Sequence, residues 1–271
     1  PTLFPPNIAF MIAHMVQLDI AWEDKPENER RVDGLLASSS VAPGDLVVLP
    51  ELFDTGFSFR LEKTADTDGR TLDYLRRTAA ARRITIQGSR TVIGTDGRGR
   101  NRATIVGPGG EILAEYDKIH PFSFGKESEH FTGGKGVVVY KWRDATDELT
   151  VCPAICYDLR FPELFRQGVT LGAELIAIGA NWPAPRALHR QVLLQARAIE
   201  NQACVLGVNR AGRDPHHEYA GASMAFGPRG EPLAAGDERE CVVPVVIDPG
   251  QIRRWRADFP ALRDARLLDR L

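Results

Sequence analysis

Val151-Cys-Pro-Ala-Ile-Cys-Tyr-Asp-Leu-Arg-Phe-Pro-Glu163 is the stretch from which the fold can be read outward. Residues 149–155 form an apolar run with the length of one buried strand. Pro162 stands where a helix can begin, because proline is tolerated in a first helical turn. We therefore expect Cys156 at a strand-to-helix corner, where unpaired N–H groups lower a thiol's pKa and hold an oxyanion. A buried structural cysteine is the alternative, and this stretch alone does not decide between the two.

Composition excludes several classes of protein. The chain has 271 residues, of which 43% are hydrophobic and 26% charged, as in an ordinary soluble globular protein with a substantial core. A net charge of −2 leaves no basic excess to neutralise phosphates, so we expect no nucleic-acid partner. Because the chain lacks an apolar run of ~18 residues, we expect no membrane span.

The N-terminus and the cysteines indicate the compartment. The opening Pro1-Thr-Leu-Phe-Pro-Pro has no basic start followed by an apolar segment, so we expect no signal peptide. The cysteines at 152, 156, 204 and 241 form no CxxC pair and have no histidines at zinc spacing. We expect reduced thiols, no metal and a cytoplasmic protein.

Strands and helices alternate along the chain, which predicts the α/β class, and no linker or repeat divides residues 1–271, which predicts a single domain. The expected helices are 23–40, 71–83, 163–171 and 189–201. The expected strands are 8–18, 46–49, 84–87, 90–93, 103–106, 111–116, 137–142, 149–155, 175–178, 204–208, 223–226 and 242–247. We expect a long irregular loop at 121–135 and a charged tail at 253–271.

Four buried strands end in a polar residue, at Glu51, Lys118, Cys156 and Asn181. In open α/β sheets, sites gather beyond the carboxyl ends of strands. Glu51 is a candidate base or a solvated loop carboxylate, and Lys118 is a candidate cation for an oxyanion or a surface lysine. If Glu51 is a base, the apolar residues Leu52, Phe53 and Phe57 are the expected pocket wall that raises its pKa.

Three blocks of sequence, taken in order, resemble the nitrilase, or carbon–nitrogen hydrolase, superfamily. They are Leu49-Pro-Glu-Leu-Phe-Asp-Thr-Gly-Phe57, Tyr116-Asp-Lys-Ile-His-Pro-Phe122 and Ile155-Cys-Tyr-Asp-Leu-Arg-Phe-Pro-Glu163. The resemblance runs nearly end to end and implies an α-β-β-α sandwich. It also implies a homodimer that uses the helix at 189–201 and the tail from about residue 253.

The resemblance implies roles for four residues. Cys156 is the nucleophile, Glu51 the general base and Lys118 the partner of the oxyanion. A second glutamate follows the lysine; we place it at Glu127, with Glu129 as the alternative because loop lengths vary there. The chemistry needs no cofactor and no metal, only a small amide substrate and water.

The sequences of these blocks are similar to those of the ω-amidase branch, whose members hydrolyse the terminal amide of 2-oxoglutaramate. A dicarboxylate-like substrate needs a cation for its far carboxylate, and Arg160 and Arg186 are candidates for this role. The alternative for each is a surface arginine or a structural ion pair, and the sequence favours it at least as much. The expected walls of the pocket are Phe57, Phe122, Tyr157 and Trp182. We expect His120 and the pair His216-His217 to be packing or loop residues.

Other functions remain open at this stage. An N-carbamoyl-amine hydrolase, an aliphatic amidase or a true nitrilase keeps the same machinery with another substrate. A non-catalytic binding protein on the same fold is an alternative from another class. A dinucleotide-binding oxidoreductase is excluded because no GxGxxG motif follows the first strand.

Overall fold

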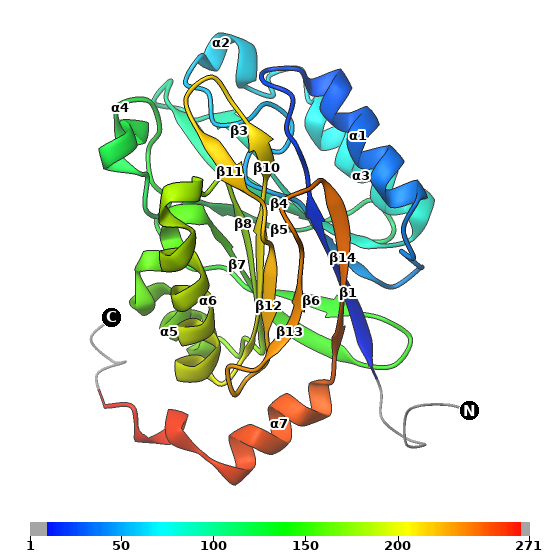
Figure 1. The fold of residues 1–271 in the computed structure, drawn as a ribbon, viewed down its shortest axis with the longest axis vertical. Helices are drawn as coiled ribbons and strands as arrows, with labels where there is room; N and C mark the ends of the chain where they lie inside the picture. The colour runs from blue at the N-terminus through cyan, green and yellow to red at the C-terminus, as the bar shows by residue number, and fades with distance from the viewer. Residues whose placement is uncertain (1–9, 267–271) are drawn as a thin grey trace.

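Two six-stranded sheets face each other in the computed structural model, which describes residues 10–266 (Figure 1). Helices cover the outer face of each sheet, so the expected α-β-β-α sandwich is confirmed. No helix of this described range is long and apolar enough to cross a membrane.

The first sheet has parallel strands at its centre and antiparallel strands at its edges. Strand β2 pairs in parallel with β1 and with β3, while β14, β4 and β5 add in antiparallel register. In sheet order the strands are β14 (Cys241–Ile247), β1 (Met11–Gln17), β2 (Leu46–Val48), β3 (Thr85–Ile93), β4 (Gly99–Val106) and β5 (Ile112–Asp117).

The second sheet repeats this plan. Strand β8 pairs in parallel with β7 and β9, and the outer strands are antiparallel. In sheet order the strands are β13 (Pro232–Ala235), β12 (Met224–Phe226), β9 (Cys204–Asn209), β8 (Leu175–Ala180), β7 (Glu148–Ile155) and β6 (Tyr140–Arg143). A separate hairpin joins β10 (Ala211–Arg213) to β11 (Glu218–Ala220). Strands β10, β11 and β13 were not expected from the sequence, because each is only three or four residues long.

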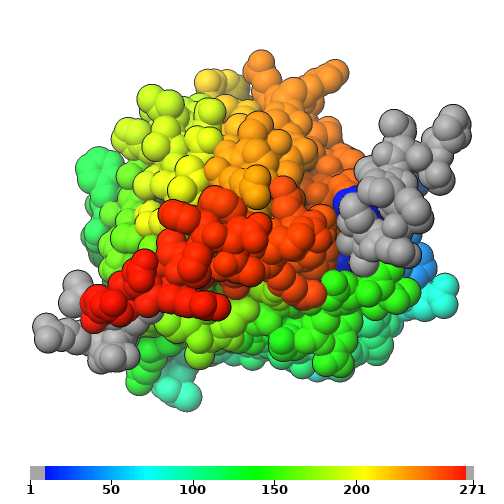
Figure 2. Space-filling model, turned by 90° about the horizontal axis from the view of Figure 1, so that it is seen from below, coloured from blue at the N-terminus to red at the C-terminus, as the bar shows by residue number. Residues whose placement is uncertain are grey.

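Two helices pack on each sheet, and a further helix lies across one end of the sandwich (Figures 1 and 2). Helix α1 begins after Asp24, whose carboxylate accepts from the Glu27 N–H and so caps the first turn. The helices on the first sheet are α1 (Lys25–Ala37) and α3 (Arg70–Arg82), and those on the second are α5 (Pro162–Thr170) and α6 (Ala187–Asn201). The end helix is α7 (Pro249–Asp258), and two single turns are α2 (Leu61–Thr64) and α4 (Glu127–His130).

The alternation of side chains along each strand builds the layers. In β2, Leu46 and Val48 enter the core between the two sheets, whereas Val47 faces the α1 and α3 layer. Strand β8 divides in the same way, with Leu175 facing the other sheet and Ile176 facing α5 and α6. Strands buried on both faces read as continuous apolar runs, which is why the sequence located them.

Two expected strands are one. The sequence predicts separate strands at 84–87 and 90–93, but β3 runs unbroken from Thr85 to Ile93. Position 88 inside this strand is a glycine because a Cβ there would stand 2.9 Å from the Phe53 ring. The glycine therefore allows close packing of Phe53 and does not mark a turn.

The remaining differences lie at loops and ends. The expected irregular loop at 121–135 contains a 3₁₀ turn, η1 (Ser123–Gly125), and helix α4. The expected charged tail from residue 253 begins inside helix α7. Residues 8 and 9 of the first expected strand and residues 267–271 of the tail lie outside the described range.

The two sheets approach each other closely beside the polar strand ends. Gly179 of β8 faces the chain that leaves β2, and a Cβ at this position would stand 2.6 Å from the Leu49 carbonyl oxygen and 3.2 Å from the Glu51 nitrogen. Only a residue without a side chain fits here without moving Glu51.

Gly179→Ala should therefore destabilise the protein, because the new methyl group displaces the backbone that carries Glu51. We expect the free energy of unfolding to fall by about 1–3 kcal/mol, the usual cost of overpacking. Urea unfolding measures this loss. Gly136→Ala is the matched control, since no atom lies within 4 Å of a Cβ there. Equal stability of the two variants would contradict the close approach.

Candidate active site

Glu51 stands three residues beyond β2, in a backbone held by both sheets. Leu52 has a φ of +44°, a left-handed conformation that costs free energy in a residue with a side chain, and its N–H donates to the Ser89 hydroxyl at 2.6 Å. From the second sheet, the Asn181 N–H donates to Glu51 Oε2 at 3.0 Å, and Asn181 Nδ2 donates to the Glu51 carbonyl at 2.9 Å. These bonds fix the direction of the carboxylate.

Lys118, directly after β5, lies between two carboxylates. Its Nζ is 2.8 Å from Glu51 Oε1 and 2.8 Å from Glu127 Oε2. The three side chains are only 2%, 1% and 0% exposed, respectively. Glu127 opens helix α4 and its Oε2 also accepts the Phe122 N–H at 2.6 Å, whereas Glu129 is exposed. Of the two glutamates left open by the sequence, the structure brings Glu127 to Lys118.

Cys156 follows β7 and begins a 3₁₀ turn, η2 (Cys156–Arg160), so helix α5 starts one turn later than the corner itself. Its φ of +44° is unfavourable for a residue with a side chain. The fully buried Asp158 stabilises this corner, because its Oδ2 accepts from the Ile155 N–H at 3.0 Å and from the Tyr116 hydroxyl at 2.7 Å. The strained corner turns the thiol toward the pocket.

His120 belongs to the support of this corner. Its ring nitrogen Nδ1 lies 2.8 Å from Asp158 Oδ1, which also accepts the His120 N–H at 3.0 Å. The imidazole stacks on Phe161 with a centroid distance of 3.7 Å. These contacts agree with the packing role expected for His120.

The surroundings of Cys156 favour the neutral thiol over the thiolate. Burial, followed by the negative charge of Glu51, raises the Cys156 pKa well above its usual range, and the nearby Lys118 offsets only part of this effect. Burial alone would lower the Lys118 pKa, but Glu127 and Glu51 raise it above its usual value, so the lysine stays charged. Burial also raises the Glu127 pKa, against the pull of Lys118. The resting form of Cys156 is therefore the neutral thiol.

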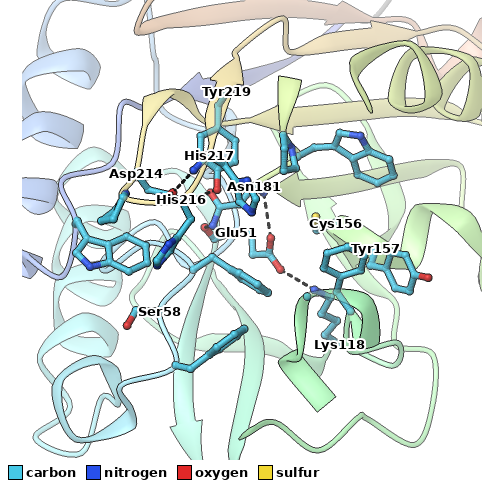
Figure 3. Close-up of a pocket in the computed structure, with 18 of the residues that line it drawn as sticks. Glu51, Ser58, Lys118, Cys156, Tyr157, Asn181, Asp214, His216, His217 and Tyr219 are labelled. Carbon is cyan, nitrogen blue, oxygen red and sulfur yellow. Dashed lines mark hydrogen bonds and ion pairs between the residues drawn. The ribbon is translucent and has the colours of Figure 1, made fainter. Parts of the chain in front are cut away.

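A cavity of about 770 Å³ opens above Cys156, Glu51 and Lys118 (Figure 3). All four aromatic residues expected as walls line it, namely Phe57, Phe122, Tyr157 and Trp182. Two other expected wall residues are wrong: Leu52 and Phe53 are buried at 1% and 0% exposure, and Phe53 packs in the core between the first sheet and its helices. Their chain turns inward after Glu51, so only Phe57 returns to the cavity.

Both candidate arginines line the same cavity. The Arg160 guanidinium lies 4.9 Å from the Trp182 ring, and that of Arg186 lies 5.6 Å from the Phe122 ring. Within residues 10–266, neither forms an ion pair with a carboxylate, so both charges remain available to a ligand.

Several lining residues were not expected from the sequence. His216 and His217, assigned to a polar loop, lie with Tyr219 and Asp214 on the far side of Glu51 from Cys156 (Figure 3). The β10–β11 hairpin carries them over the cavity, and no spacing in the sequence signals that fold-back. Asn181 was noticed only as a strand end, and Asn101, which contacts both carboxylates, carried no signal at all. The described residues contain no cluster of three or more His, Cys, Asp or Glu able to hold a metal ion.

Comparison with known proteins identifies the family of the chain. The model of the carbon–nitrogen hydrolase family matches residues 12–257. The chain is 35% identical to the omega-amidase YafV of Escherichia coli K12 over 93% of its own length and 95% of that protein. It is 34% identical to a 2-oxoglutaramate amidase of Bacillus subtilis, over 93% of this chain and 96% of the relative.

Solved structures with the same fold are also found. A carbon–nitrogen hydrolase superfamily protein from Xanthomonas campestris, with an arsenic adduct in its active site, is 34% identical with a TM-score of 0.88. The alignment covers 96% of this chain and 98% of that one. Nit3 of Saccharomyces cerevisiae is 24% identical with a TM-score of 0.80, over 93% and 94% of the two chains, and shows the shared fold.

Lys118→Met should destabilise the protein strongly at neutral pH, because Glu51 and Glu127 would remain buried without their shared cation. We expect a loss of about 3–5 kcal/mol, as for other broken buried ion pairs. Urea unfolding at pH 7 measures it. Lys63→Met is the control, since that side chain is 54% exposed and 4.0 Å from its carboxylate. Wild-type stability in Lys118→Met would show that the buried pairs do not form.

Proposed function

Since the chain belongs to the carbon–nitrogen hydrolase family, we propose that it hydrolyses the terminal amide of a small ω-amido 2-oxo acid such as 2-oxoglutaramate. The observation that carries this proposal is the convergence of Glu51, Lys118 and Glu127 beside Cys156 at the base of one cavity. Similarity to an omega-amidase and to a 2-oxoglutaramate amidase favours this substrate class within the family.

In the proposed reaction, the Cys156 sulfur attacks the amide carbon while Glu51 accepts the thiol proton. Transfer during the attack suits a thiol whose pKa burial keeps high. The carbonyl electrons move to oxygen, and Lys118 and the Tyr157 N–H stabilise that oxyanion. The C–N bond then breaks as Glu51 returns the proton to nitrogen. Ammonia departs, and the acyl group remains on Cys156 as a thioester.

Water completes the proposed cycle. Glu51 takes a proton from the water molecule as its oxygen attacks the thioester carbon. The C–S bond breaks, the proton passes to the sulfur, and the carboxylic acid product leaves. Glu127 holds Lys118 in place through its 2.8 Å contact, so the ammonium faces the oxyanion in both steps.

The walls of the cavity support the choice of substrate. Phe57, Phe122, Tyr157 and Trp182 enclose a short carbon chain. Arg160 and Arg186 are our proposed partners for the far carboxylate, because guanidinium groups bind carboxylates with two bonds and neither is paired with an acid among residues 10–266.

We propose further that the protein is a cytoplasmic homodimer. The four cysteines are free, which suits a reducing compartment. Helix α6 exposes Leu188, Val192 and Ile199, an apolar surface beside the site that suits a second copy. The chain from about residue 253 is the proposed second contact.

An ammonia-release screen tests the substrate. We expect higher kcat/KM for 2-oxoglutaramate than for glutamine, a simple nitrile, a carbamoyl amino acid or an ω-amide without the far carboxylate. Cys156→Ala should lose about 10⁴-fold or more in kcat and keep its thermal unfolding midpoint. Release of carbon dioxide with ammonia would indicate a carbamoyl-amine hydrolase, and binding without turnover of any substrate would indicate a binding protein.

Alkylation by iodoacetamide tests the base. Cys156 should react first at pH 7, since it opens on the cavity whereas Cys152 and Cys204 are buried. In Glu51→Gln this reaction should slow about 100-fold at pH 7 and recover only at alkaline pH, because burial still holds the Cys156 pKa above its usual range and no carboxylate at position 51 accepts the proton. Mass spectrometry of the peptides measures both rates, with the partly buried Cys241 as internal reference. An unchanged Cys156 rate would exclude Glu51 as its base.

A further inference from the structure

Asn101 of β4 bridges the two carboxylates that flank Lys118. Its Nδ2 donates to Glu51 Oε1 at 2.8 Å and to Glu127 Oε1 at 3.2 Å. The side chain is buried, with the residue 2% exposed. The two hydrogens of one amide nitrogen therefore each form a hydrogen bond to a different carboxylate.

The backbone of the same residue holds the lysine. The Asn101 carbonyl accepts the Lys118 N–H at 2.9 Å, directly beyond the paired register of β4 and β5. Asn101 thus contacts all three charged residues of the cluster. A shift of this one strand position would move the ammonium and both carboxylates together.

Charge balance explains why a neutral donor suits this place. Two carboxylates share one ammonium, so the cluster carries an excess negative charge, and like charges at close range favour uptake of a proton. An amide stabilises both ionised carboxylates through hydrogen bonds. A second cation would neutralise Glu51 and weaken its ability to accept a proton.

The orientation of the amide is determined by the carboxylates. With the group turned over, the amide oxygen would face two negatively charged oxygens. As placed, Asn101 Oδ1 is buried and accepts no hydrogen bond from any residue in the range 10–266. Both hydrogens of Asn101 Nδ2 bind the two carboxylates, while Oδ1 has no protein partner within residues 10–266. A buried acceptor without a partner costs stability, so this orientation serves the carboxylates at the expense of the stability of β4.

We propose that Asn101 is a positioning residue: its amide orients the Glu51 and Glu127 carboxylates around Lys118 and its two hydrogen bonds favour the charged form of the pair, so that Glu51 faces the thiol as the proton acceptor. This inference rests on the proposed role of Glu51 as base. The charged and titratable groups around Glu51 are Lys118, Glu127 and Cys156, with Tyr219, Asp214, His216 and His217 further away on the side of the β10–β11 hairpin. Of these, Lys118 contacts both carboxylates as a cation, and Asn101 is the uncharged side chain that donates to both.

The test compares Asn101→Leu, which has a similar shape without a donor, with Asn101→Asp, which adds a third acid. We measure kcat and KM for 2-oxoglutaramate and the rate of Cys156 alkylation by iodoacetamide, each from pH 5 to pH 10. In Asn101→Leu the acid limb of kcat and of alkylation should move up by about one pH unit or more, because the carboxylates hold a proton to higher pH. KM should change less than about three-fold, and Asn101→Asp should shift the limb at least as far.

Asn201→Leu is the matched control. Asn201 is a fully buried asparagine of α6 whose Nδ2 donates to the Arg197 carbonyl at 3.0 Å, away from the cluster. Its replacement should lower the thermal unfolding midpoint and leave both pH profiles unchanged. If Asn101→Leu does not fold, Asn101→Asp alone decides.

Two results would overturn the inference. Profiles in the folded Asn101 variants that match wild type would remove the positioning role, and equal shifts in Asn201→Leu would assign the effect to general destabilisation. Failure of the proposed substrate is distinguishable, because alkylation needs no substrate. An unaltered alkylation profile in Glu51→Gln would instead remove the proposed base, and this inference with it.

Discussion

A single buried ammonium group, that of Lys118, holds the site together. It lies 2.8 Å from a carboxylate of each of two loops that are far apart in the chain, one after β2 and one at helix α4. Taking three charges out of water is costly, and such a cluster persists only where geometry and further hydrogen bonds compensate. Asn101, Asn181 and the Phe122 N–H provide those bonds, so the loops are ordered by the same contacts that prepare the chemistry.

The thiol reaches this cluster through backbone strain that the second sheet sustains. Cys156 and Leu52 both adopt left-handed conformations, one at each side of the gap between the sheets. Asp158 stabilises the first and Ser89 the second. Strain of this kind persists at functional sites because the surrounding structure leaves no alternative, and here it accompanies the placing of Cys156 and Glu51 in one cavity.

Burial also bears on the proposed reaction. It raises the Cys156 pKa, and the negative charge of Glu51 adds to the effect, so Cys156 rests as a thiol. The proposed proton transfer during the attack suits this resting state better than a preformed thiolate does. At the sequence level the reverse was expected, since a helix N-terminus lowers a thiol's pKa, but η2 separates Cys156 from α5 and the carboxylate dominates.

The sequence by itself located most strands and helices, because continuous apolar runs depend on neighbours in the chain. Its resemblance to the superfamily implied the sandwich and pointed to Glu51, Lys118 and Cys156, but it left Glu127 and Glu129 open, and the contact with Lys118 selects Glu127. It did not determine that β3 is unbroken at Gly88, which depends on a ring from a distant loop. Nor did it find Asn101 or the hairpin that carries His216, whose importance comes only from what they meet in space. The tertiary structure alone decided these, since burial, charge pairing and close packing arise between segments that the sequence keeps apart.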